Sequence, residues 1–145
     1  MNLQVKTRVA SNYRHVWQNF GEKLFRALNP PFPPVKVSRF DGSRKGDEVH
    51  LQLNFILFRQ QWVSTIVESV EAEGECYFVD EGTRLPFFLK YWRHRHRIVQ
   101  DGEATLIIDD ITFEAPLPLL NFLLWPTMLA QFAYRKPVYK KFFSR

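Results

Sequence analysis

Apolar and polar residues alternate along several stretches of the chain, which is the pattern of strands with one buried face. The alternation runs over residues 2–9 and again over residues 49–57. Three further stretches, 35–40, 61–70 and 76–80, are rich in β-branched and aromatic side chains, which favour strands. The chain up to about residue 115 is therefore predicted to be mainly antiparallel sheet.

Helical spacing follows the first predicted strand. Ser11 or Asn12 can cap a helix whose apolar positions recur every three or four residues as far as Phe20. A second short helix is predicted over residues 24–28. The proline-rich segment 29–34 ends it, because proline lacks an N–H and disfavours helix before it.

The segment after Pro116 also favours helix. Residues 117–125 predict one short piece, and Pro126 fits the first turn of a longer helix. Pro137 predicts a kink or break near Ala133.

A β-hairpin is predicted around Asp101-Gly102, which lies between two alternating stretches. With these two residues as the loop, Gln100 lies opposite Glu103. The pairs on one face are then His96 with Ile107, His94 with Asp109, and Trp92 with Ile111. The other face carries Arg93, Arg95 and Arg97, which would need matching anions inside a pocket. The mixed face is therefore predicted to line a binding cavity.

That face carries three candidate functional residues, His94, His96 and Asp109. They could anchor the polar group of a ligand in an apolar cavity, or form a satisfied cross-strand hydrogen bond within the core. In a third interpretation His94 is a general base oriented by Asp109. Two His and one carboxylate also match a facial triad for iron, but nothing else in the sequence supports a metal.

Two further segments have alternative interpretations. Residues 82–89 are predicted to form a loop whose tip, Pro86-Phe87-Phe88, either covers the mouth of a cavity or fills the core. Basic and aromatic residues interleave over 134–145. This pattern is typical of a solvated helix face, and it also fits peripheral contact with an anionic membrane.

Composition narrows the class of protein. The chain has 145 residues, 46% hydrophobic and 16% aromatic, which fits one domain over 1–145 with a substantial core. Cys76 is the single cysteine, so no disulfide can form within the chain. The longest apolar stretch, 117–125, is too short to cross a membrane, and we expect a cytoplasmic protein. The net charge of +5 permits anionic partners without requiring them.

A set of short segments, spread over essentially the whole chain, carries a resemblance to a known family. These segments are Val16-Trp17 with Phe20, Arg39-Phe40-Asp41-Gly42 with Gly46-Asp47, Phe78 to Gly82, Pro86-Phe87, Trp92 to His96, and Thr105 to Asp109 with Pro116. Through them the sequence resembles the START-like, Bet v 1-like helix-grip superfamily, which includes polyketide cyclase-like proteins, and most closely its bacterial ligand-binding domain proteins.

The resemblance implies an α+β fold in which a curved antiparallel sheet wraps around a long C-terminal helix. It implies a cavity between the sheet and that helix that binds a hydrophobic small molecule or lipid. The expected polar contacts are His94, His96, Asp109 and Asp80; the expected walls are Leu53, Phe55, Trp62, Trp92, Ile107, Ile111, Met128 and Phe132.

No cofactor, metal or nucleic acid is expected, and the pattern fits either a monomer or a homodimer. Two alternatives stay open. One is a cyclase, dehydratase or isomerase-like enzyme that uses a His–Asp pair. The other is an interaction or stress-response module with a filled core.

Overall fold

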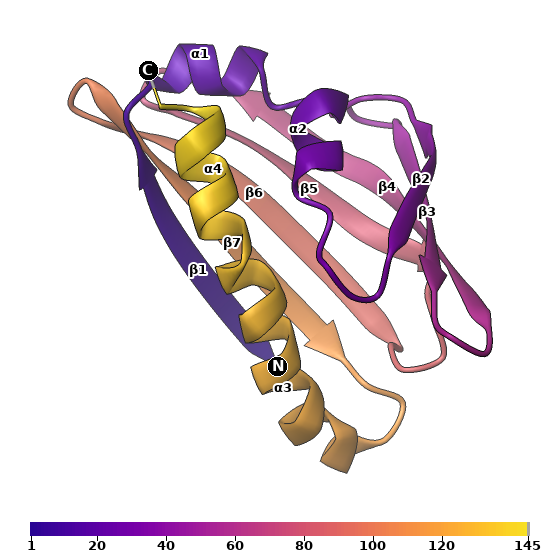
Figure 1. The fold of residues 1–145 in the computed structure, drawn as a ribbon. Helices are drawn as coiled ribbons and strands as arrows, with labels where there is room; N and C mark the ends of the chain where they lie inside the picture. Colours follow the sequence, from indigo (N-terminus) through magenta and orange to yellow (C-terminus); the bar gives the residue numbers. More distant parts are fainter. Residues whose placement is uncertain (145) are drawn as a thin grey trace.

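The computed structural model describes residues 1–144, which form one antiparallel sheet and four helices (Figure 1). The sheet order is β1-β7-β6-β5-β4-β3-β2, so every neighbour in the sheet except β1–β7 is also a neighbour in sequence. The strands are β1 (Asn2–Val9), β2 (Val35–Phe40), β3 (Glu48–Asn54), β4 (Arg59–Glu71), β5 (Glu75–Arg84), β6 (Tyr91–Asp101) and β7 (Ala104–Glu114).

Two short helices lie near one end of the sheet, and a longer pair crosses its face (Figure 1). Helices α1 (Tyr13–Gln18) and α2 (Glu22–Ala27) follow β1, and Asn12 caps α1 through a bond from the His15 N–H. The C-terminal pair, α3 (Pro118–Ala133) and α4 (Arg135–Phe142), packs against β1. The predicted α+β helix-grip architecture is confirmed.

The β6–β7 hairpin forms, but its register differs by two residues from the predicted one. Gly102 and Glu103 are the loop residues, and Asp101 pairs with Ala104. Gly102 has φ +62°, and glycine is favoured at the first loop position of a type II′ turn. The observed pairs are His96 with Asp109, His94 with Ile111, and Trp92 with Phe113. Because the shift is two residues, each side chain stays on its predicted face.

Three predicted boundaries are also wrong. Strand β5 continues to Arg84 instead of turning at Gly82, and β3 ends at Asn54 before Phe55. Pro126 lies inside α3 rather than in its first turn. The break near Ala133 is observed, because α3 ends there and α4 begins at Arg135.

The buried apolar residues form two clusters under the C-terminal helices. One joins α1 and α2 to α4 through Val16, Leu24 and Tyr139. The other joins β1, β6 and β7 to α3 through Trp92, Ile111 and Phe132. The α3–α4 pair thus packs against the sheet through one cluster at each of its ends. A cavity lies beside this helix pair.

Candidate functional site

A cavity of about 430 Å³ lies between the sheet and the helices. Its walls come from α2, the segment before β2, strands β2 to β6, α3 and the first residue of α4. Nine of the twelve predicted site residues line it: Leu53, Phe55, Trp62, Asp80, Trp92, His94, His96, Met128 and Phe132.

The remaining three predicted site residues are not part of the lining. Ile107 and Ile111 are fully buried in the two apolar clusters. Asp109 is 1% exposed and contacts His94 from behind the wall. The carboxylate predicted to face a ligand therefore supports an imidazole instead.

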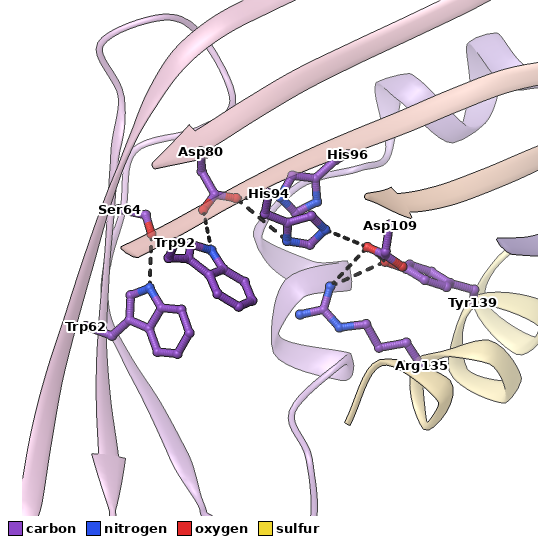
Figure 2. A network of polar contacts seen from close by, with 9 residues as sticks. All are labelled: Trp62, Ser64, Asp80, Trp92, His94, His96, Asp109, Arg135 and Tyr139. Carbon is purple, nitrogen blue, oxygen red and sulfur yellow. Dashed lines mark hydrogen bonds and ion pairs between the residues drawn. The ribbon is translucent and has the colours of Figure 1, made fainter. Parts of the chain in front are cut away.

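A continuous polar network runs along the deep wall of the cavity (Figure 2). His94 Nε2 donates to Asp109 Oδ1 at 2.9 Å, and His96 Nε2 donates to Asp80 Oδ2 at 2.6 Å. The indole N–H of Trp92 donates to Asp80 Oδ1 at 3.1 Å. An ionised carboxylate can only accept, so each imidazole carries its proton on Nε2.

The two imidazoles are held by stacking as well as by hydrogen bonds. Their ring centroids lie 3.5 Å apart, and Phe78 stacks on the other side of His96 with a centroid distance of 4.2 Å. The Phe132 ring meets His94 edge-on. Trp62 packs edge-on against Trp92, and its own indole N–H donates to Ser64 Oγ. Aromatic packing on several sides fixes the orientation of the polar groups.

The C-terminal helices supply two network residues that the sequence interpretation missed. Arg135 lies on the cavity wall, with its guanidinium 4.4 Å from the Phe132 ring centroid and Nη1 3.6 Å from Asp109 Oδ1. Tyr139 is fully buried and donates from its hydroxyl to Asp109 Oδ1 at 3.3 Å. Figure 2 shows both side chains reaching Asp109 from the helix side.

A signal for these two residues was present in the sequence. Met128, Phe132, Arg135 and Tyr139 follow each other at spacings of four, three and four residues, which places them on one helix face. The interpretation of residues 134–145 as a solvated basic run obscured it. Arg135 and Tyr139 belong instead to the buried side of that segment.

Burial and charge set the protonation states of the network. Desolvation and the nearby His96 lower the pKa of His94 to about 4, so this imidazole is neutral at pH 7. Burial alone would raise the pKa of Asp80, but the hydrogen bond and charge of His96 lower it below the usual range. Burial opposes the lowering of the Asp109 pKa in the same way, while His94 and Arg135 produce it. Burial and the charge of Asp109 raise the pKa of Tyr139.

Asp80, His94 and His96 also offer three ligand atoms within 4.8 Å of one another. This set replaces the triad with Asp109 that the sequence suggested. The two rings lie side by side with an interplanar angle of 26°, and His96 is hydrogen-bonded to Asp80. In this structure the three side chains form a hydrogen-bonded cluster.

The three arginines of β6 lie on the outer face of the sheet, as predicted. Arg93 pairs with Glu81 at 2.9 Å, and Arg97 pairs with Glu75 at 2.8 Å. The Arg95 guanidinium lies over the Tyr77 ring, 4.1 Å from its centroid. Anions and an aromatic ring on that face contact all three cations, which leaves the opposite face to the cavity.

No family model and no curated protein sequence matches the chain. Solved structures do match it. A START superfamily protein from Mycobacterium smegmatis has a TM-score of 0.73 at 12% identity, over 98% of this chain and 96% of that chain. The Zhui aromatase/cyclase from Streptomyces sp. R1128 has a TM-score of 0.65 at 14% identity, over 95% and 90%.

A third match is an enzyme with ligands bound. Norcoclaurine synthase from Thalictrum flavum, in complex with dopamine and hydroxybenzaldehyde, has a TM-score of 0.69 at 13% identity, over 98% of this chain and 85% of that chain. Identities this low establish the fold and leave the activity open. The chain thus has the helix-grip fold of the START-like and Bet v 1-like proteins, a group in which some members bind ligands and others are cyclases or synthases.

Proposed function

We propose that the protein binds a hydrophobic small molecule or lipid in the cavity between the sheet and the C-terminal helices. The observation that carries this proposal is the combination of an apolar cavity of about 430 Å³ with a polar cluster on one wall. Ligand sites are typically apolar enclosures with a few placed polar groups that orient the ligand.

Asp80 and Arg135 are the groups best placed to contact the polar part of a ligand. Their side chains are 13% and 16% exposed, whereas His94 and Asp109 are at most 3% exposed. A carboxylate and a guanidinium on the same cavity offer one acceptor and one donor group. The imidazoles between them hold the carboxylate in place.

A blocked-cavity variant provides the test of binding. Leu51 lines the cavity from β3, and its neighbour Gln52 is absent from the lining because side chains alternate along a strand. We expect native mass spectrometry to detect a co-purifying small molecule, and we expect 1-anilinonaphthalene-8-sulfonate to bind the ligand-stripped protein. Leu51→Trp places an indole in the cavity and should weaken probe binding by about tenfold or more.

Gln52→Trp is the matched control and should leave probe affinity within about twofold. The proposal fails if the purified protein carries no small molecule and binds no probe. It also fails if Leu51→Trp, shown to be folded by circular dichroism, binds the probe as well as the unaltered protein does.

A proton-transfer enzyme is the second candidate, and the Asp80–His96 contact of 2.6 Å on the cavity wall favours it. His94 is a poor general base at neutral pH, since its pKa is about 4. The Asp80–His96 pair therefore replaces His94 as the candidate acid–base group. The activity would be established if the protein turns over the co-purifying molecule and if His96→Gln abolishes this turnover but still binds the molecule. Turnover by His96→Gln equal to that of the unaltered protein would exclude the role of His96.

A further inference from the structure

One end of the molecule exposes a cluster of large apolar side chains. The antiparallel order of the sheet places the β3–β4 loop, the β5–β6 loop and the β7–α3 connection at the same end, which is the lower end in Figure 1. The side chains that define this apolar end are Ile56, Leu57, Phe87, Leu119, Phe122 and Leu123. Leu57 is 91% exposed and Leu119 is 82% exposed, so nothing within the described chain covers them.

The first half of α3 is apolar on both of its faces. Leu119, Phe122 and Leu123 are spaced as one helix face and are exposed, while Leu124 and Met128 line the cavity on another. The sequence has no charged residue between Glu114 and Arg135. A helix that is apolar all round is normally covered on every side. The outer face of α3 is therefore a surface without its partner.

The apolar end also carries positive charge. The exposed cations there, at or beside the strand ends, are Lys36, Arg59, Arg84 and Lys90, and they outnumber the exposed Glu114 at the end of β7. The turns at the opposite end of the sheet carry charges of both signs, with exposed Glu71, Glu73 and Glu103 alongside exposed Arg44 and Lys45. Apolar side chains flanked by cations match the interface of an anionic bilayer, which combines an apolar interior with negative head groups.

We propose that this apolar end docks on the surface of an anionic lipid bilayer, with Leu57 and the outer face of α3 entering the acyl boundary. A symmetric second copy would bring the cations of two chains together at one interface, which like-charge repulsion disfavours. The docking does not depend on the proposed ligand binding, and a chain with a filled cavity could dock in the same way.

The lining of the cavity extends to the same end. Phe55 and Phe88 line the cavity and meet edge-on, with ring centroids 6.2 Å apart. Phe58 and Phe87 form the next aromatic pair outward, with centroids 5.7 Å apart, and both are more than 40% exposed. Phe88 thus lines the cavity and also packs against the apolar cluster under α3, while the exposed Phe87 extends toward the docking surface. The basic α4 is an unsuitable docking element, because Tyr139 and Phe143 are buried in the core.

Vesicle co-sedimentation tests the docking. We expect the protein to sediment with vesicles of phosphatidylcholine containing phosphatidylglycerol, and to bind pure phosphatidylcholine more weakly. Leu57→Glu places a carboxylate at the bilayer surface and should weaken binding to the anionic vesicles by about tenfold or more. Leu119→Glu on α3 tests the same surface from a second element and should have the same effect.

Ala72→Glu is the control, because it makes the same charge change at an exposed turn at the opposite end of the sheet. It should alter vesicle binding by less than about twofold. The docking proposal is overturned if the unaltered protein binds neither kind of vesicle. It is also overturned if Leu57→Glu and Leu119→Glu bind the anionic vesicles as well as the unaltered protein does. A dimer in solution that Leu57→Glu dissociates, without vesicle binding by the unaltered protein, would assign the surface to a second copy instead. Probe binding in the cavity is measured separately, so a failure here leaves the proposed ligand site standing.

Discussion

Asp109→Ala is expected to lower the free energy of unfolding by about 3–5 kcal/mol, because it breaks a buried network of charged and polar groups. The carboxylate accepts from His94 at 2.9 Å and from Tyr139 at 3.3 Å, and it lies 3.6 Å from the Arg135 guanidinium. Without it, the His94 and Tyr139 donors lose their acceptor, and the Arg135 cation loses its counterion. Thermal or urea denaturation followed by circular dichroism measures the change, and the melting temperature should fall by roughly 10 °C or more.

The adjacent residue provides the control. Asp110 lies on the outer face of β7, opposite Arg95, and Asp110→Ala should change stability by only about 0.5 kcal/mol. A double variant separates the charge from the hydrogen bonds. Arg135→Met in the Asp109→Ala background should recover part of the loss, because it removes the unpaired cation. A loss below about 1 kcal/mol for Asp109→Ala would show that this network does not hold the helices to the sheet.

The fold was predictable from sequence because its main signals are local. Alternation over residues 2–9 and the paired stretches around Gly102 specify which side of each strand is buried. The exact pairing register of β6 with β7 was harder to predict from the sequence. Asp101-Gly102 fits one type of two-residue turn and Gly102-Glu103 fits another, and only the observed backbone distinguishes them. Both turns place each side chain on the same face of the hairpin, so the register error did not change which strand residues are predicted to face the cavity.

The sequence predicted the two imidazoles of the site correctly, but it predicted only some of the residues that contact them. His94 and His96 reach the cavity wall because strand alternation fixes their side. Asp80 becomes their neighbour only through the pairing of β5 with β6, which no short turn signal specified. Arg135 was missed because a basic run is usually solvated. Its burial depends on the path of α3 and α4 across the sheet, which is a long-range property of the fold.

Lowering the pH from 7 to 4 is expected to destabilise the protein by about 3 kcal/mol through His94 alone. The unfolded chain protonates this imidazole near its ordinary pKa of 6.5, whereas the folded protein holds it neutral until about pH 4. The unfolded state therefore binds more protons in this window, and stability falls as the pH falls. Asp80 and Asp109, whose pKa values are lowered in the folded protein, add a further loss below about pH 4.

His94→Gln isolates this effect. Glutamine can still donate to Asp109, but it does not titrate. Urea denaturation at a series of pH values should therefore give a slope for the variant that is shallower by up to about 1.4 kcal/mol per pH unit between pH 6 and 4.5. Equal slopes for the two proteins would mean that His94 takes up its proton in the folded state. In that case the bare Nδ1, now 3.9 Å from Asp80 Oδ2, would become a donor to that carboxylate, and the cluster would act as a proton acceptor at neutral pH.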